Sequence, residues 1–469
     1  MGATAKNLEP SSSPQSAGDR LALGLATTTA MWTVGYLCRM PGAEVPAPLI
    51  LALVLVLPVV GGFLAAARTR RGRAGGLKVG LIAGAFNLLI LGSLGSHLTT
   101  DQRIAHYALL WGPISMALCG LLALLGATVG RRFNPARRQY LDGPAALTLT
   151  TTLATLVLVM AGGMVTGMNA GLSVPDWPDT FRYNLFLFPL SHMTGGVFFE
   201  HTHRLLGTLV GLAVFVQAVF LWRCDHRRGV KWFAALTVVM IGCQGLLGGL
   251  RVTGYFTGAK TAAAMAPSTT LAVVHGVFGQ LCFAAVAVLA AFCSRRWRTV
   301  EPETKTHEPQ TTNHKPETTN HNPETLSTQV PSHSAAFGLL LNWTLVATLV
   351  LQLTLGSILR HVGHVLVLHV TVAVFVLVLA FFAGIRAWAL YTGEPVLERL
   401  GIALLLTVSL QVLLGIGAVI AIGGQGPLRH PDFLQALVTT VHQTTGAILL
   451  VLATLLAVWS MRLPPTATG

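Results

Sequence analysis

The chain has 469 residues, of which 53% are hydrophobic and 10% are charged, and its mean hydropathy is +0.65. This composition excludes a soluble globular protein and is typical of a polytopic membrane protein. The formal net charge of +14 does not indicate nucleic-acid binding, because the basic residues lie at the ends of apolar segments and in short loops, where membrane topology accounts for them.

Twelve apolar segments are each long enough to cross a bilayer as a helix. We therefore predict an all-α integral membrane protein with about twelve transmembrane helices. The expected spans are residues 21–38, 48–67, 77–97, 107–130, 145–167, 198–222, 232–252, 269–293, 336–359, 365–388, 399–422 and 435–460.

These spans fall into three membrane units and one linker. Residues 1–144 are predicted to form an N-terminal four-helix extension. Residues 145–294 and 336–469 are predicted to form two tandem, pseudo-symmetric four-helix bundles. The linker between them, residues 295–335, is rich in Pro, Thr and Glu and is expected to be disordered and cytoplasmic.

A repeat with an offset of 166 or 167 residues supports the two bundles. Within it, the glycines of QGLLGG (244–249) are expected to let neighbouring helices approach closely. The repeated residues include Gln244 and Gln411, Gly248 and Gly415, His275 and His442, and Gly279 and Gly446.

Four histidines lie a few residues inside apolar segments: His203, His275, His369 and His442. The members of the two pairs are 72 and 73 residues apart. Two imidazoles in a four-helix bundle can clamp a haem iron, so we predict one such clamp in each bundle. For any single histidine, an interhelical hydrogen bond is an equally good explanation. If His369 is not a ligand, His364 is the expected substitute.

Basic connectors predict the membrane topology. They alternate with connectors poor in Lys and Arg, which places the basic loops and both termini in the cytoplasm. The loop at residues 168–197 is then extracytoplasmic, and all four histidines lie near the outer face. The basic connectors are residues 68–73, 131–138, 223–231 and 295–298.

Glu200 is the main candidate for a chemical role. It lies three residues before His203, so both share one helix face. An acid at a membrane boundary is costly unless it is paired or functional, which makes Glu200 a site candidate; a solvated interfacial acid is the alternative. Arg204, Arg251 and Arg360 lie on the same outer side and could bind haem propionates. Each could equally be a basic residue snorkelling to the interface.

Several segments together resemble the haem A synthases, bacterial and mitochondrial membrane proteins that convert haem O into haem A for cytochrome oxidase. The resemblance covers residues 145–461. It is carried by GGMVTGMNAGLSVPDWP (162–178), EHTHRLLGTLVG (200–211), VVHGVFGQ (273–280), LHVTVAVF (368–375) and TVHQTTGA (440–447).

The resemblance implies a membrane oxidoreductase that oxidises the C8 methyl group of haem O to a formyl group through an alcohol. In the family, the C-terminal bundle retains a haem b, which assigns His369 and His442, together with Arg360, to this cofactor. The N-terminal bundle receives haem O.

For the substrate site, the resemblance assigns His203 and His275 to the iron of haem O. Arg204 and Arg251 would contact the same substrate, and Glu200 would act at its methyl edge. Bis-histidine ligation suits an electron-transfer haem, whereas the substrate site needs one labile ligand or an oxidation route through the porphyrin ring.

Three features depart from the family pattern. The cysteine pair that some bacterial members carry in their outer loops is absent, so a redox role for such a pair does not apply. Val370 follows His369, where an arginine can follow in relatives. The four N-terminal spans lie outside the usual eight-helix core.

Two other functions remain open. A b-type cytochrome could carry electrons from a quinol without modifying haem, and Glu200 with the NAGLSVPDWP segment (169–178) argues against it. A transporter would need acids near the bilayer centre, where this chain has almost none. The expected partners are haem O, the bilayer of a bacterial plasma membrane, haem O synthase and cytochrome oxidase assembly proteins; self-association is left open.

Overall fold

The computed structural model describes residues 15–69, 72–95, 108–133, 140–253, 268–300, 332–391, 393–423 and 432–463. Most of the linker predicted at residues 295–335 lies outside these ranges. The described residues contain no strand, and twelve of their helices are long and apolar enough to cross a membrane. The predicted all-α membrane fold class is therefore confirmed.

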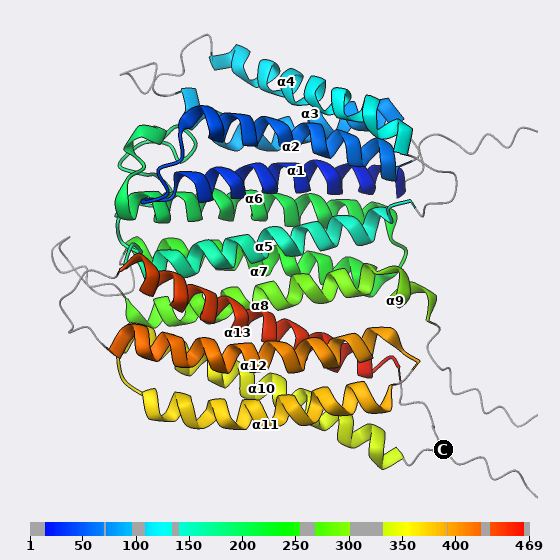
Figure 1. The fold of residues 1–469 in the computed structure, drawn as a ribbon, viewed down its shortest axis with the longest axis vertical. Helices are drawn as coiled ribbons and strands as arrows, with labels where there is room; N and C mark the ends of the chain where they lie inside the picture. The colour runs from blue at the N-terminus through cyan, green and yellow to red at the C-terminus, as the bar shows by residue number, and fades with distance from the viewer. Residues whose placement is uncertain are drawn as a thin grey trace, which may run out of the picture.

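Each of the twelve long helices covers one predicted span (Figure 1). The largest difference is at the first helix, which begins at Gln15 rather than at residue 21, because the polar turn before the apolar segment is also helical. The helices are α1 (Gln15–Arg39), α2 (Ala47–Arg68), α3 (Gly72–Gly95), α4 (Ala108–Gly130), α5 (Gly143–Gly167), α6 (Gly195–Cys224), α7 (Arg228–Thr253), α8 (Thr269–Cys293), α10 (Ser332–Val362), α11 (Leu366–Leu390), α12 (Pro395–Gly423) and α13 (Phe433–Ser460).

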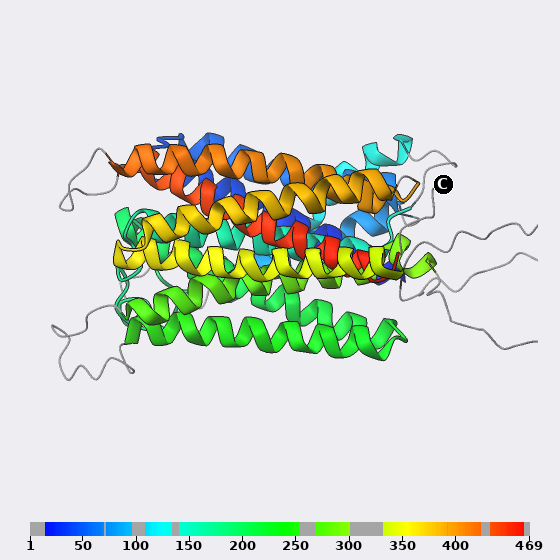
Figure 2. The same cartoon turned by 90° about the horizontal axis from the view of Figure 1, so that it is seen from below.

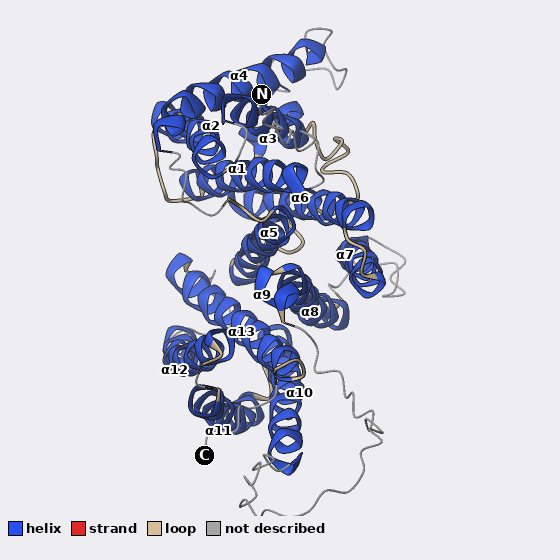
Figure 3. Cartoon of the chain, turned by 90° about the vertical axis from the view of Figure 1, so that its right-hand side faces the viewer, coloured by secondary structure: helices blue, strands red, loops and turns tan. Residues whose placement is uncertain are grey.

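Two groups of four helices repeat the same cyclic arrangement. In the first bundle, α5 packs on α6 and α8, and α7 packs on the same two helices. In the second, α10 packs on α11 and α13, and α12 closes the ring between them. Figure 3, which views the helices nearly end-on, shows the second group below the first. The two bundles therefore share one connectivity and one packing scheme.

The bundles meet through α13, which packs on α5 and α8. Glycines allow this close approach: a Cβ atom placed on Gly163 would lie 2.8 Å from the Thr440 methyl carbon, and one on Gly167 would lie 3.0 Å from the Ala436 Cβ. In Figure 2 the helices of both bundles run side by side along the same direction. The two bundles thus form one continuous helical body.

The N-terminal extension packs against the first bundle through α1. This helix contacts α5 along its length and the start of α6, where Tyr36 stacks on Phe198 with ring centroids 5.4 Å apart and planes 8° from parallel. Helices α2, α3 and α4 pack on one another beyond α1. The extension is therefore attached beside the segment that begins with Glu200.

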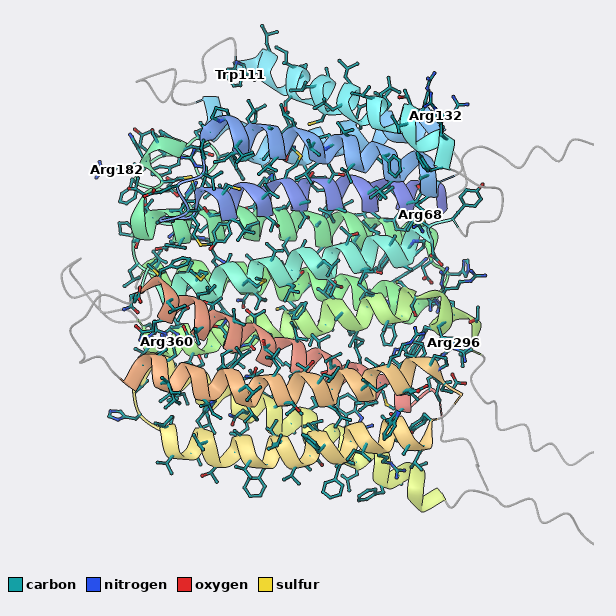
Figure 4. The ribbon with its side chains drawn as sticks, in the orientation of Figure 1. Arg68, Trp111, Arg132, Arg182, Arg296 and Arg360 are labelled. Atoms are coloured by element: carbon teal, nitrogen blue, oxygen red, sulfur yellow. The ribbon has the colours of Figure 1, made fainter. Side chains whose placement is uncertain are left out.

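The basic connectors gather at one end of the helices. Figure 4 shows Arg68, Arg132 and Arg296 at this end, and Arg182 and Arg360 at the opposite end. The relative sidedness agrees with the alternation in the sequence. Which end faces the cytoplasm remains a prediction from the Lys and Arg bias.

Candidate functional site

Glu200 lies in the second turn of α6 and is only 4% exposed, so it is not a solvated interfacial acid. Its Oε2 accepts a hydrogen bond from the backbone N–H of Val174 at 3.0 Å. Its Oε1 accepts one from Nη2 of Arg204 at 2.8 Å. The carboxylate is thus held between its own helix and the loop that precedes it.

Arg204 fixes the same loop through three carbonyl groups. Its Nη1 donates to the backbone oxygens of Asp176 at 2.7 Å and Asp179 at 3.0 Å, and its Nη2 donates to that of Val174 at 2.8 Å. The first three turns of α6 therefore hold the outer loop, residues 168–194, through Glu200 and Arg204. Sequence reasoning did not find this role for Arg204, because its partners are main-chain groups with no sequence signature.

His201 contributes a third contact with the loop. Its side chain is fully buried, and its Nδ1 lies 3.0 Å from the Thr180 hydroxyl. The Phe188 ring packs on the imidazole with centroids 4.9 Å apart. The loop therefore covers His201.

Asp176 organises the tip of the loop. Its carboxylate accepts hydrogen bonds from the backbone N–H groups of Phe181 at 2.9 Å and Arg182 at 2.7 Å. Partial burial alone would raise the pKa of Asp176, but these hydrogen bonds and the nearby Arg204 outweigh it, so the pKa lies below its usual value. Phe181 and Arg182 both adopt positive φ angles, 49° and 64°, which the ionised carboxylate helps to hold.

Arg251, in the last turn of α7, contacts the outer loop at Gly171. A Cβ atom on Gly171 would fall 2.3 Å from its Nη2, so a larger residue there would require the guanidinium to shift. Glu200 is close enough to interact electrostatically with Arg251. Among the described residues, the buried Nε of Arg251 has no hydrogen-bond partner. Arg251 is thus a half-buried cation whose Nε has unused donor capacity.

Arg360 lies at the end of α10 in the second bundle, but its hydrogen bonds reach the first bundle. Its Nη2 donates to the backbone oxygen of Thr166 and, at 2.9 Å, to Oδ1 of Asn169. The guanidinium therefore joins the end of α10 to the end of α5 and the start of the outer loop.

Each of the four predicted histidines faces a glycine on the preceding helix. A Cβ atom on that glycine would lie only about 3 Å from Cε1 of the imidazole, so any larger residue would push the ring away. The distances from such a Cβ to Cε1 are 2.9 Å for Gly162 and His203, 3.1 Å for Gly248 and His275, 3.1 Å for Gly356 and His369, and 3.2 Å for Gly415 and His442.

This arrangement corrects the role expected for the QGLLGG glycines. Gly248 makes room for an imidazole, and Gly249 makes room for the indole of Trp177 from the outer loop. At Gly245, no described atom lies within 4 Å of a Cβ position. Gly248 and Gly249 therefore make room for the site and its loop, and Gly245 makes no close approach to any described atom. The recurrence of a glycine four residues after a glutamine was the available signal in the sequence.

The histidines of the first bundle have a separation that fits a shared iron. The ring centroids of His203 and His275 are 6.4 Å apart, with planes at 83°. Two opposed metal–nitrogen bonds of about 2 Å each, with the depth of two rings added, give a centroid separation of roughly 6 Å. In the second bundle, His369 lies on α11 and His442 on α13, close enough to interact electrostatically. His364 is exposed in the turn before α11.

The imidazoles also have unused polar atoms. In the described part of the chain, Nδ1 of each of the four rings is buried without a hydrogen bond of normal geometry. For each ring, the backbone carbonyl of the residue four positions before the facing glycine lies nearby but does not form a hydrogen bond of normal geometry with it. These residues are Leu158, Gln244, Gln352 and Gln411. A small adjustment would let Nδ1–H donate to this carbonyl and leave Nε2 free to bind a metal.

A bare metal ion does not fit these sites. The described residues contain no group of three or more His, Cys, Asp or Glu side chains that could hold one. A porphyrin supplies four nitrogens of its own and requires only axial ligands from the protein. The paired imidazoles therefore fit a haem and not a protein-only metal centre.

Comparison with known proteins identifies one family for most of the chain. The family model described as COX15-CtaA, cytochrome oxidase assembly protein, matches residues 145–454. A relative named Heme A synthase from Shouchella clausii is 29% identical over 149 residues, which cover 31% of this chain and 44% of the relative.

Two further relatives carry the same name. The protein from Azorhizobium caulinodans is 25% identical over 196 residues, which are 37% of this chain and 54% of the relative. The protein from Geobacillus kaustophilus is 32% identical over 112 residues, which are 22% of this chain and 32% of the relative. The chain thus spans about a third to a half of the length of these curated relatives.

Proposed function

Because the chain belongs to the COX15-CtaA family of cytochrome oxidase assembly proteins, which covers residues 145–454, we propose that it oxidises the C8 methyl group of haem O to a formyl group and so makes haem A. The main support for this proposal is the pair of imidazoles, His203 and His275. They lie in the first bundle next to the buried Glu200 and its loop. The relatives named Heme A synthase support the same activity.

In this proposal, His369 and His442 hold a resident haem b in the second bundle. Gly356 and Gly415 leave the space that each ring needs, and the two imidazoles come from helices that belong to one ring of four. A haem with two histidine ligands supplies one-electron transfer. The protein's own contribution is to fix the two rings and exclude water with the surrounding apolar side chains.

His203 and His275 hold the iron of the substrate haem O in the first bundle. Their 6.4 Å centroid separation supports this role. The outer loop lies over α6 and α7, since Glu200 and Arg204 bind its main chain and Trp177 packs on Gly249. The loop would limit the access of water to the reacting edge of the porphyrin.

Glu200 acts as a proton acceptor or as a fixed negative charge beside the C8 methyl group. Each carboxylate oxygen accepts one hydrogen bond, from Val174 or from Arg204. An ionised carboxylate has about four acceptor sites, so Glu200 retains capacity for a proton. The two hydrogen bonds hold its rotamer, which general-base catalysis and electrostatic stabilisation both require.

Arg251 is the best-placed partner for a propionate of the substrate. It is half-buried, its Nε has no partner within the described residues, and charge-assisted bonds to a carboxylate would use that donor. Arg204 and Arg360 remain propionate candidates, but both donate to main-chain oxygens already and would have to exchange those bonds. Arg360 would serve the resident haem.

The cellular setting follows from the same proposal. The protein would lie in a bacterial plasma membrane with both termini in the cytoplasm and the haem sites near the outer face. It would receive haem O from a haem O synthase and pass haem A to proteins that assemble cytochrome oxidase.

The decisive experiment is co-expression of the full chain with a haem O synthase, followed by mass analysis of the extracted haems. Haem A or its hydroxymethyl precursor supports the proposal, provided that both are absent when the synthase is expressed alone. Protohaem and unmodified haem O alone, from a protein with a normal b-type spectrum, would overturn it and favour an electron-transfer cytochrome.

A further inference from the structure

One position differs among four otherwise equivalent histidine sites. In every helix pair, the residue four positions before the facing glycine lies beside the same imidazole. Three of these residues are glutamines and the fourth is a leucine. They are Leu158 beside His203, Gln244 beside His275, Gln352 beside His369 and Gln411 beside His442.

The three amides occupy the same place relative to their rings. The amide nitrogen lies 3.3 Å from Nε2 of His275 for Gln244, and 3.3 Å from Nε2 of His369 for Gln352. For Gln411 and His442 the corresponding distance is 3.5 Å. Each amide therefore marks the edge of the imidazole that would bind an iron.

Leu158 fills the place that the amides fill elsewhere. Four residues after His275 and His442, a glycine faces this position: a Cβ on Gly279 would lie 2.8 Å from the Gln244 amide nitrogen, and one on Gly446 would lie 3.2 Å from that of Gln411. A Cβ on Gly207 would lie 4.0 Å from Cδ1 of Leu158. The first site thus keeps the shape of the other three but lacks the polar group.

The amide orients its imidazole more than it competes for the metal-binding lone pair. The nitrogen–nitrogen distances are long for hydrogen bonds, so the competition is weak. Gln244 has a better partner: its Nε2 donates to the backbone oxygen of His275 at 2.9 Å and ties α7 to the ligand-bearing helix α8. A directional polar group beside a ring restricts its rotation, and an oriented ligand loses less entropy when it binds.

We propose that the leucine at position 158 makes His203 the exchangeable ligand of the substrate site, whereas Gln244, Gln352 and Gln411 are positioning residues that hold the other three imidazoles. This proposal rests on the proposed function, in which the first bundle must release its tetrapyrrole and the second must retain it. The second bundle has two amides for two ligands. The first bundle has one amide for two ligands, so the iron of its haem can stay bound to His275 while His203 dissociates from it.

The test is the rate at which protohaem leaves the full-length protein for an excess of apomyoglobin. Protein loaded with protohaem should lose it in a fast phase from the first bundle and a slow phase from the second. Leu158→Gln should slow the fast phase, and Gln352→Leu, at the equivalent position, should accelerate the slow phase. The free energy of one hydrogen bond predicts changes of roughly three- to tenfold in these rates of haem loss.

Leu158→Met is the matched control, since it keeps the volume and adds no amide, and it should leave the fast phase unchanged. The unaltered bundle in each variant reports on folding. The ferric low-spin electron paramagnetic resonance signal of the second bundle should broaden in Gln352→Leu, because its imidazole is less well oriented.

Three results would overturn the proposal. One is unchanged transfer rates in both exchanged variants. Another is the opposite pattern, faster loss in Leu158→Gln and slower loss in Gln352→Leu, which would show that the amide competes with iron. The third applies if the first bundle takes up no protohaem: it is the failure of Gln352→Leu and Gln411→Leu to accelerate loss from the second bundle. The assay involves no turnover, so its result is independent of whether the protein makes haem A.

Discussion

Glu200 and Arg204 form a buried ion pair at 2.8 Å, one helical turn apart at the start of α6, and both bind the main chain of Val174. The pair links a candidate catalytic group to the loop that covers it. An acid in this position can affect turnover through its charge or through the placement of the loop. Experiments on Glu200 must therefore separate these two effects.

We expect Glu200→Gln to keep the b-type spectrum of the second bundle but to make little or no haem A. The amide is neutral and a very poor proton acceptor, and general acid–base catalysis contributes roughly 10²–10⁴-fold to turnover. Haem O or the alcohol should accumulate. The measurement is the haem composition of purified protein after co-expression with a haem O synthase.

The control is the accessibility of the outer loop, residues 168–194, to limited proteolysis. Glutamine can still accept a hydrogen bond from Val174 or Arg204, so we expect cleavage like that of the unaltered protein. Arg204→Ala removes three bonds to loop carbonyls and should expose the loop. Near-normal haem A production by Glu200→Gln would remove Glu200 from the chemistry and leave holding the loop as its role.

Replacing either His369 or His442 by Ala should abolish the low-spin b-type spectrum of the purified protein, because a bis-imidazole field needs both ligands. His364→Ala should leave the spectrum intact, since His364 is exposed in the turn before α11. Loss of the spectrum in His364→Ala and its retention in His369→Ala would exchange the two assignments.

The helices were predictable from the sequence because the length of an uninterrupted apolar segment, a local property, determines where a transmembrane helix forms. The span expected at residues 198–222 is α6, and the repeat of Gln244 as Gln411 marks equivalent positions in two bundles. The hydrogen bonds from Arg204 to the loop were not predictable, because its acceptors are backbone carbonyl groups, which every residue has. Only the path of the loop determines that the carbonyl of Asp176 is one of them. The roles of Gly248 and Leu158 likewise depend on which imidazole faces them across a helix pair.

Gly248→Ala should reduce haem binding in the first bundle, since the new Cβ would lie 3.1 Å from Cε1 of His275, closer than most such contacts. Gly245→Ala lies on the same helix, and no described atom is within 4 Å of its Cβ position. Alanine there should leave haem binding unchanged and stabilise α7 by up to about 1 kcal/mol. Haem content and thermal unfolding measure the two effects. Equal haem content in both variants would contradict the proposed contact.

Reporter fusions test the orientation of the membrane body. Fusions within residues 295–335 and at the C-terminus should report a cytoplasmic position, and fusions within residues 168–197 an extracytoplasmic one, as the Lys and Arg bias requires. Arg296, within the first of these ranges, and Arg182, within the second, lie at opposite ends of the helices, so the two sets must disagree (Figure 4). An external signal from the linker would invert the topology and place the histidines near the cytoplasmic face.

Asp176→Asn should loosen the tip of the outer loop at neutral pH. The ionised carboxylate accepts two backbone hydrogen bonds, from Phe181 and Arg182, and holds its pKa below the usual value despite partial burial. A group with a depressed pKa in the folded state stabilises above its unfolded pKa of about 4, and this stabilisation is lost as the pH falls through the folded value.

Hydrogen exchange of the Phe181 and Arg182 amides, compared between the variant and the unaltered protein at the same pH, checks this prediction. At pH 7 the variant should exchange roughly tenfold faster, because hydrogen bonds to a charged acceptor are the stronger ones. As the pH falls well below 4 the two proteins should converge, since the protonated acid no longer differs from the amide in charge. Asp179→Asn is the matched control: only the backbone oxygen of Asp179 contacts Arg204, so exchange should not change. A difference between Asp176→Asn and the unaltered protein that persists undiminished in acid would show that the carboxylate charge is not what holds the turn.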